Sequence, residues 1–232
     1  MIHQGSRETY VYPRVYEALK RLKIQCGRNR IARIMREYGI KSKMSRRCRK
    51  HRHRHYLIHD PKNLLLNRPP PKVCNEVWVC DVTYIRVADD WNYLCTIMDL
   101  YSRKIIGWHF APRLTKDVAY EALMMALEDN QPGDDAIFHT DRGVEFSTKY
   151  LKEALDRHGL RASKGRAGCC WDNAAMESFY HTLKTEMVYF QAFKNLVEAV
   201  AYIMDYLRFY NNDRLHSSLQ YRSPEEFAKC VA

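Results

Sequence analysis

The stretch VWVCDVTYIRV (residues 77–87) decides the fold class of this 232-residue chain. It is rich in valine, isoleucine, tryptophan, tyrosine and threonine, which favour β-strands. Residues 92–99 and 104–111 follow as two further strand-like segments, and only short connections separate the three. Because short connections join neighbouring antiparallel strands, these segments predict a three-stranded meander.

Downstream of this meander, helical and strand-like patterns alternate. Hydrophobic spacing and chain breakers predict short strands over residues 136–139 and 160–163, and helices over residues 115–130, 147–158, 172–188 and 193–210. The predicted fold class is α/β, with the element order βββαβαβα. A mixed sheet covered by helices is compact and leaves strand ends free to carry a functional site.

Upstream, apolar residues at helical spacing predict two short helices over residues 12–22 and 28–38. Pro13 suits a first helical turn, and Gly39 suits a C-terminal cap. The second helix is basic, which favours a DNA-binding helix-turn-helix pair, whereas a plain helical hairpin docked on the next domain is the alternative. Its candidate DNA-binding residues are Arg28, Arg30 and Arg33.

A basic run follows, with eight cations and no acid between residues 41 and 54. Each phosphate neutralised by a cation releases condensed counterions, so the run favours contact with a nucleic-acid backbone; a solvated linker is the alternative. A zinc site built from Cys48 and the nearby histidines lacks zinc-finger spacing. The candidate phosphate-binding residues of the run are Lys41, Lys43, Arg46, Arg47 and Arg49.

The segment Arg68-Pro69-Pro70-Pro71 is a stiff extended spacer, and we place a domain boundary there. The predicted domains are a helix-turn-helix-like DNA-binding segment over residues 1–45, a basic and proline-rich linker over residues 46–72, and a catalytic core with a C-terminal helix over residues 73–232.

Composition excludes several classes of protein. The chain has 38 lysines and arginines against 27 acids, a net charge of +11, and its 46% of hydrophobic residues excludes a mainly disordered chain. No apolar run approaches the roughly 20 residues of a bilayer span, and no apolar signal segment begins the chain. We therefore expect a cytoplasmic protein without a membrane partner. Eight cysteines without C-x-x-C spacing indicate reduced thiols.

Three acidic residues fall where a fold can bring them together. Asp81 shares a strand face with mostly apolar residues, and Asp141 directly follows a short strand; Glu177 lies in a helix, with His181 and Lys184 on its face. Three such acids suit two divalent cations about 3.5 to 4 Å apart, which clamp the attacking and leaving oxygens of an in-line displacement. Taken singly, each acid also fits an ion pair, a turn or a helix surface.

These residues belong to a set of motifs that spans nearly the whole chain. The motifs are WVCDVTY (78–84), DLYSR (99–103), HTDRG (139–143), DNAAMESF (172–179) and LKTE (183–186), with Tyr210, Asn211, Arg214, His216 and Leu219. Together they resemble the catalytic subunit of DDE transposases of the insertion-sequence-three family, which are related to retroviral integrases. The 35 residues between Asp141 and Glu177, and the lysine seven residues after that glutamate, match the family's signature.

The resemblance implies an RNase-H-like core behind a helix-turn-helix-like domain. In that family Asp81, Asp141 and Glu177 would hold two Mg²⁺ ions, with Mn²⁺ as a substitute, and Lys184 would bind the element end. The implied reaction is the cutting and joining of double-stranded DNA, at element ends and target, by transesterification. The resemblance further implies a homo-oligomer on DNA and a frameshift fusion to a protein of an upstream reading frame.

Three other functions stay open on the sequence. A non-catalytic DNA-binding relic, or an inhibitor that occupies element ends, has no use for intact acids. An RNA/DNA-hybrid nuclease of the same fold leaves the N-terminal helices and the basic run without a role. A transcription regulator leaves the three acids unexplained.

Overall fold

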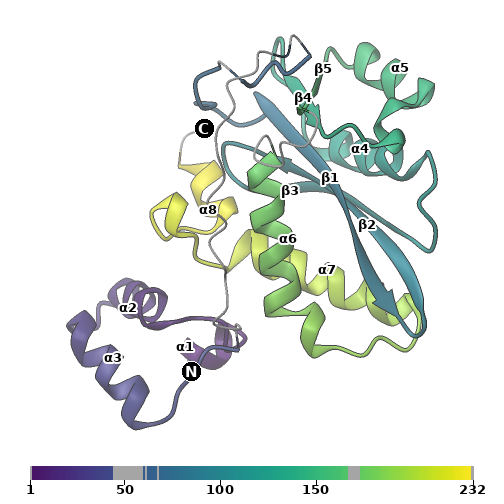
Figure 1. Ribbon diagram of the computed structural model, residues 1–232. Coiled ribbons are helices and arrows are strands. Elements are labelled where there is room, and N and C mark those ends of the chain that lie inside the picture. The colour runs from purple at the N-terminus through teal and green to yellow at the C-terminus, as the bar shows by residue number, and fades with distance from the viewer. Residues whose placement is uncertain (1, 44–59, 61, 67, 167–172, 231–232) are drawn as a thin grey trace.

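The computed structural model describes residues 2–43, 60, 62–66, 68–166 and 173–230. Its centre is a five-stranded mixed sheet in the order β3-β2-β1-β4-β5 (Figure 1). The first three strands form the predicted antiparallel meander, and the last two extend the sheet in parallel. The strands are β1 (Val77–Val87), β2 (Asp90–Asp99), β3 (Ile105–Ala111), β4 (Ile137–Thr140) and β5 (Arg161–Lys164).

Strand β1 carries buried apolar side chains on both of its faces. Val77, Val79 and Ile85 belong to one hydrophobic cluster, while Trp78 and Cys80 belong to another. Because successive side chains of a strand point to opposite faces, the two clusters lie on opposite sides of the sheet. This double coverage explains why the segment is almost continuously apolar.

Two pairs of helices cover the two faces. Residues of α4 and α5 pack with Trp78, and residues of α6 and α7 pack with Val79. β3 and α4 come close because residue 107 is glycine: a Cβ there would lie 2.3 Å from the carbonyl oxygen of Ala122. The covering helices are α4 (Val118–Asp129), α5 (Lys149–Arg157), α6 (Ala174–Glu186) and α7 (Leu196–Asn212).

A C-terminal segment follows α7 that the sequence patterns did not predict. It contains a short α-helix, α8, whose start is fixed by a capping box in which Ser223 and Glu226 each accept a hydrogen bond from the other's backbone N–H. This helix is α8 (Pro224–Lys229), and the 3₁₀ turn η4 (Ser217–Leu219) precedes it. Two further 3₁₀ turns lie earlier in the described part of the chain, η1 (Val144–Ser147) and η3 (Val188–Phe190).

The N-terminal region forms the two predicted helices and one further turn. Pro13 lies in the first turn of α2, as predicted. Gly39 follows the C-cap of α3 with φ of +65°, the left-handed conformation that glycine adopts at little cost. The helices are α1 (Ile2–Gly5), α2 (Tyr12–Arg21) and α3 (Arg28–Glu37).

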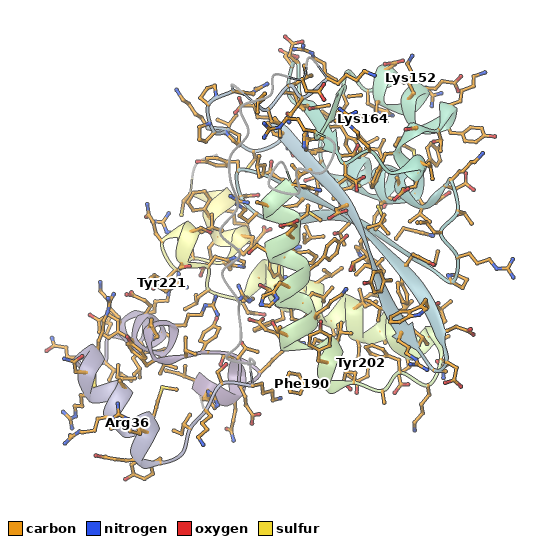
Figure 2. All side chains as sticks on the ribbon, in the orientation of Figure 1. Arg36, Lys152, Lys164, Phe190, Tyr202 and Tyr221 are labelled. Carbon is orange, nitrogen blue, oxygen red and sulfur yellow. The ribbon has the colours of Figure 1, made fainter. Side chains whose placement is uncertain are left out.

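These N-terminal helices dock on the C-terminal segment. The hydroxyl of Tyr10 accepts a hydrogen bond from the backbone of Leu215 (2.7 Å) and donates one to the carbonyl of Asp213 (3.3 Å). Arg21 contributes an ion pair with Glu226 at 3.0 Å. α3 lies on the side of the pair remote from the sheet, where Figure 2 labels Arg36.

Some sequence predictions lie outside the described residues. They concern the basic-run residues Arg46, Arg47 and Arg49, the zinc candidate Cys48 and Asp172, the first residue of the helix predicted over 172–188. Within the described ranges, no helix is long and apolar enough to span a membrane.

Candidate active site

Asp81 lies in the middle of β1, opposite Thr96 of β2. The side chain is half-buried, and one of its oxygens accepts a hydrogen bond from the backbone N–H of Val82 at 2.8 Å. Its face of the strand is the face covered by α6, because Val77 and Val79, at the same parity, pack with residues of that helix.

Asp141 follows β4 directly. β4 runs parallel to β1 and pairs with its first residues, so Asp141 leaves the sheet beside the part of β1 that leads to Asp81. The Asp141 side chain is exposed and accepts a hydrogen bond from the backbone N–H of Gly143 at 2.8 Å. This local turn holds the carboxylate outside the sheet.

Glu177 lies in the first turn of α6 and is exposed. The helix is fastened to β1 near Asp81: the Tyr180 hydroxyl lies 2.5 Å from the carbonyl oxygen of Asp81, and Asn173 donates to the carbonyl of Cys80 at 3.1 Å. These contacts fix the helix that presents Glu177 against the strand that presents Asp81.

The three carboxylates interact electrostatically at Asp81. Burial raises the pKa of Asp81 to about 7, against the opposing hydrogen bond from Val82, and the charges of Asp141 and Glu177 raise it further. Among the residues that the structure describes, no cation forms an ion pair with any of the three acids. No group of three or more histidine, cysteine or acidic residues in the described ranges is close enough to hold a metal ion as it stands. The three acids thus lie near one another, but their carboxylates do not yet surround a single metal position.

Family models match most of the chain. An integrase core domain model matches residues 72–170, a second integrase core domain model matches residues 158–224, and an HTH-like domain model matches residues 1–48. The chain is 36% identical over 226 residues to the insertion element IS600 uncharacterized 31 kDa protein of Shigella sonnei, with 97% of this chain and 83% of the relative covered. It is 34% identical over 223 residues to transposase InsF for insertion sequence IS3A of Escherichia coli strain K12, with 96% and 77% covered.

The chain belongs to the family of IS3 transposases. It is an integrase-core transposase with an N-terminal HTH-like region, and such transposases are DDE polynucleotidyl transferases that act in DNA transposition. The family and the enzyme class predicted from the motifs are confirmed.

Solved structures show the fold of the transposase. A chain of the simian T-cell lymphotropic virus intasome, solved in complex with a PP2A regulatory subunit, matches with a TM-score of 0.61 at 14% identity, covering 93% of this chain and 74% of that one. The catalytic core domain of BIV integrase matches with a TM-score of 0.53 at 15% identity, covering 67% and 94%. The HTLV-2 integrase catalytic core matches with a TM-score of 0.50 at 15% identity, covering 67% and 97%. The predicted RNase-H-like mixed sheet is confirmed.

One acidic residue near the site of the transposase was missed by sequence reasoning. The charge of Glu145, in η1, also raises the pKa of Asp81. Its carboxylate folds back over the Asp141 loop, so that a Cβ on Gly143 would lie 2.5 Å from one of its oxygens. The only signal in the sequence was its place four residues after Asp141. Spacing alone does not show which way such a loop folds.

The structure places Lys184 in an aromatic contact rather than an ion pair. Its ammonium lies 4.5 Å from the centre of the Tyr84 ring, and burial lowers its pKa. Tyr84 is on β1, three residues after Asp81, and His181 is exposed one helical turn before Lys184. Lys184 is carried, like Glu177, by α6, and its ammonium reaches β1 three residues beyond Asp81.

The remaining DNA-binding candidates that the structure describes do not join this site. They lie on or beside the N-terminal helices, and several form ion pairs there. Arg28 pairs with Glu17 at 3.1 Å and Arg33 with Glu37 at 3.7 Å. Lys43 pairs with Glu8 at 3.2 Å, while Arg30 and Lys41 are exposed. The structure thus separates a cationic N-terminal group from the acidic core.

Proposed function

We propose that Asp81, Asp141 and Glu177 are the catalytic, metal-binding residues of this transposase, which uses them to cut insertion-element ends and join them to target DNA by transesterification. The observation that carries the proposal is that the charges of Asp141, at the end of β4, and Glu177, on α6, act on Asp81 of β1. No cation among the described residues is paired with any of the three acids. Like charges in a half-buried position are unfavourable unless a cation neutralises them.

The donor set fits a hard divalent cation. All the groups are carboxylates, and oxygen ligands are those that Mg²⁺ prefers. One oxygen of Asp81 is oriented by Val82 and one of Asp141 by Gly143, which leaves the second oxygen of each without an intramolecular hydrogen bond among the described residues. The HTLV-2 integrase core, which shares the fold, was solved in complex with magnesium. We propose two Mg²⁺ ions, with Mn²⁺ as a substitute. When bound, they supply activation of the attacking oxygen and neutralisation of the leaving oxygen.

The residues of the chain orient the site. The contacts of Tyr180 and Asn173 to β1 set the position of Glu177 relative to Asp81. Lys184, whose ammonium lies over the Tyr84 ring, is proposed to contact a phosphate of the element end, and His181 presents a second polar group on the same helix face.

The HTH-like region is proposed to bind double-stranded DNA through Arg28, Arg30, Arg33, Lys41 and Lys43, with Arg46, Arg47 and Arg49 of the basic run. We keep the division into a DNA-binding segment over residues 1–45, a linker over residues 46–72 and a catalytic core over residues 73–232. A homo-oligomer assembled on paired DNA ends, a frameshift fusion to an upstream-frame protein and action in the cytoplasm complete the proposal.

The test is magnesium-dependent nicking and joining of a DNA that carries the flanking ends of the gene. Asp81→Asn is expected to abolish both steps and to retain DNA binding, while Asp134→Asn, an exposed acid in another loop, is expected to behave as wild type. Equal joining by wild type and Asp81→Asn would reject Asp81 as a catalytic residue. DNA binding without joining by the wild type, with or without the upstream-frame protein, would instead indicate a non-catalytic relic.

A further inference from the structure

A cationic pocket lies beside α6, at the junction of the N-terminal helices with the core. Its volume is about 320 Å³. It is lined by arginines, hydroxyl groups and the first residues of a helix. The lining residues that the argument uses are Arg14, Arg103, Ala174, Ser178, Arg214 and Ser217.

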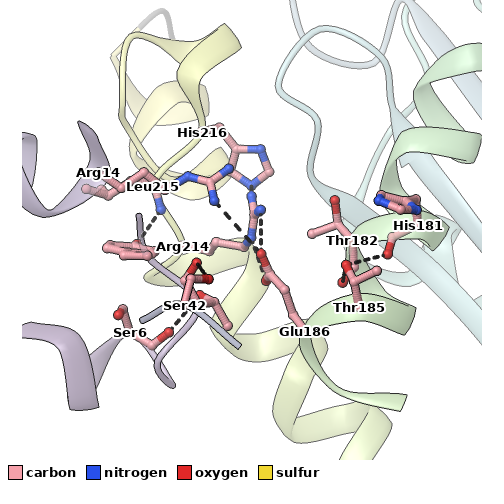
Figure 3. Close-up of polar contacts among 12 residues, drawn as sticks. Ser6, Arg14, Ser42, His181, Thr182, Thr185, Glu186, Arg214, Leu215 and His216 are labelled. Carbon is pink, nitrogen blue, oxygen red and sulfur yellow. Dashed lines mark hydrogen bonds and ion pairs between the residues drawn. The ribbon is translucent and has the colours of Figure 1, made fainter. Parts of the chain in front are cut away.

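Two of the three guanidinium groups that line this pocket share one buried carboxylate. Arg214 forms a bidentate pair with Glu186, with both N···O distances at 2.8 Å (Figure 3). Arg14, from α2, lies 3.9 Å from the same carboxylate. Glu186 is completely buried and neutralises a single positive charge. The pocket therefore holds an excess of positive charge.

Arg103 is the pocket arginine whose guanidinium makes no hydrogen bond or ion pair within the described residues, although the charge of Asp99 acts on it. It lines the pocket from the turn after β2 and is half-buried. Its backbone has φ of +62° and donates to the carbonyl of Asp99 at 2.9 Å, so the turn itself holds the residue in place. A half-buried guanidinium without an acceptor is unfavourable, and an oxyanion in the pocket would satisfy it.

The pKa of His216, beside the pocket, is lowered by burial and by the same positive charges. Burial, and then the charges of Arg214, Arg14 and Arg103, lower the pKa of His216 to about 2. His216 is therefore neutral at physiological pH, and its Nε2 accepts a hydrogen bond from Arg214 at 3.3 Å. The arginines alone supply the charge.

Neutral donors complete the lining. Ala174 and Ala175 begin α6, and the side chain of the N-cap residue, Asn173, makes no capping hydrogen bond in the described part of the chain. The first N–H groups of a helix and their dipole favour an anion. The hydroxyls of Ser178, Ser217 and Ser218 add donors around the same space. Arginine forks, hydroxyls and a helix start form a donor set that suits phosphate.

We propose that this pocket binds a phosphate group of the DNA backbone, held jointly by Arg14 of the N-terminal helices and Arg103 of the core. The assignment to DNA rests on the proposed function, whereas the phosphate chemistry rests on the pocket itself. A bound phosphate would connect the HTH-like region directly to α6, the helix that carries Glu177.

The first experiment uses the full chain and inorganic phosphate as the probe. We expect phosphate to raise the thermal midpoint of the wild type and to bind measurably in calorimetry. Arg103→Gln keeps a polar side chain but removes the positive charge and the guanidinium fork, so phosphate binding should weaken about tenfold or more. Arg113→Gln, at an exposed position outside the pocket, is the matched control and should bind like wild type. Equal phosphate binding by the wild type, Arg103→Gln and Arg113→Gln would show that the pocket does not bind phosphate through Arg103.

The second experiment distinguishes DNA phosphate from free phosphate. Arg103→Gln should weaken binding to element-end DNA and reduce the slope of log K against log salt by about one, because one phosphate contact is lost. Arg14→Gln, which changes the N-terminal side of the pocket, should act in the same direction. If both variants lose inorganic phosphate but bind DNA like wild type, the ligand is free phosphate and the assignment to DNA is wrong.

The proposed catalytic acids and the proposed phosphate pocket can be rejected independently of each other. Asp81→Asn should lose joining while it keeps phosphate binding and the DNA salt slope. Arg103→Gln should lose phosphate binding whatever the catalytic outcome. If Arg103→Gln folds poorly by circular dichroism, Arg103→Lys gives the same test, since it keeps the charge, loses the fork and should bind phosphate with intermediate affinity.

Discussion

The hydroxyl of Tyr180 lies 2.5 Å from the carbonyl oxygen of Asp81 and accepts a hydrogen bond from Thr96 at 2.8 Å. One side chain thus joins α6 to the neighbouring strands β1 and β2 at the position of the candidate catalytic aspartate. The contact fastens α6, the helix that carries Glu177, to the strand that carries Asp81.

Tyr180→Phe should loosen that connection. The change leaves the Asp81 carbonyl and the Thr96 hydroxyl without this partner, which should lower the free energy of unfolding by about 1–2 kcal/mol. Because α6 then has less restraint against β1, we expect slower strand joining at unchanged DNA affinity. Urea denaturation and a joining assay measure the two effects. Tyr202→Phe, at a partly exposed position on α7, is the control; a Tyr180→Phe protein that joins DNA at the wild-type rate would contradict the positioning role.

Glu177→Gln should abolish strand transfer and leave DNA binding intact. The amide keeps the shape of the side chain and loses the charge that binds metal. Gel-shift titration and a joining assay on the same DNA test the prediction, with Glu128→Gln on exposed α4 surface as the control. Retained transfer in the Glu177 variant would remove this residue from the site.

The stability of the metal-free protein should fall as pH rises. The pKa of Asp81 is about 7 in the folded chain, above the value of about 3.9 in an unfolded chain. The folded state therefore binds the Asp81 proton more tightly than the unfolded state does. The stabilisation that this protonation gives to the folded state is complete below about pH 4 and is lost as the pH rises through 7. Thermal melts between pH 4 and 8 should show this decline, and Asp81→Asn should reduce it.

Magnesium should reverse that decline in the wild type. A ligand that binds only the folded state stabilises it by mass action. Added Mg²⁺ at pH 8 should raise the thermal midpoint of the wild type and have little effect on Asp81→Asn. An equal shift in both proteins would show that the ion binds elsewhere.

DNA binding should depend steeply on salt. If the residues between 41 and 54 contact several phosphates, raising salt from 50 to 200 mM should weaken binding by roughly 10³-fold or more. Fluorescence anisotropy with element-end DNA measures the slope. A flat response would reject phosphate contact by the basic run.

The sequence predicted the central sheet because its signals are local. Alternation in residues 77–87 placed Asp81 on the same face as Val77 and Val79, and the structure shows these two valines packed on the α6 side. Pro13 and Gly39 marked helix ends through their own backbone preferences, and both lie where such residues favour helix ends.

What the sequence did not predict depends on contacts between distant residues. Asn211 forms two hydrogen bonds with the backbone of Ile105, 106 positions away, and Arg214 meets Glu186 from 28 positions away. Glu145 reaches the Asp81 region only through the fold of its loop. Arg103 belongs to a recognised motif, yet its lack of a hydrogen bond or ion pair within the described residues appears only when the pocket is assembled.

The hydrogen bond of the Tyr10 hydroxyl bears on how such transposases exchange N-terminal regions by recombination. Because the Tyr10 hydroxyl satisfies the buried N–H of Leu215, the HTH-like region also completes the hydrogen bonding of a turn more than 200 positions away in the integrase core. An HTH-like region transplanted from another element must bring an equivalent hydroxyl, or the N–H of Leu215 is left without a hydrogen-bond acceptor. Recombination between elements should therefore preserve matched pairs of these two segments, even though they lie at opposite ends of the gene.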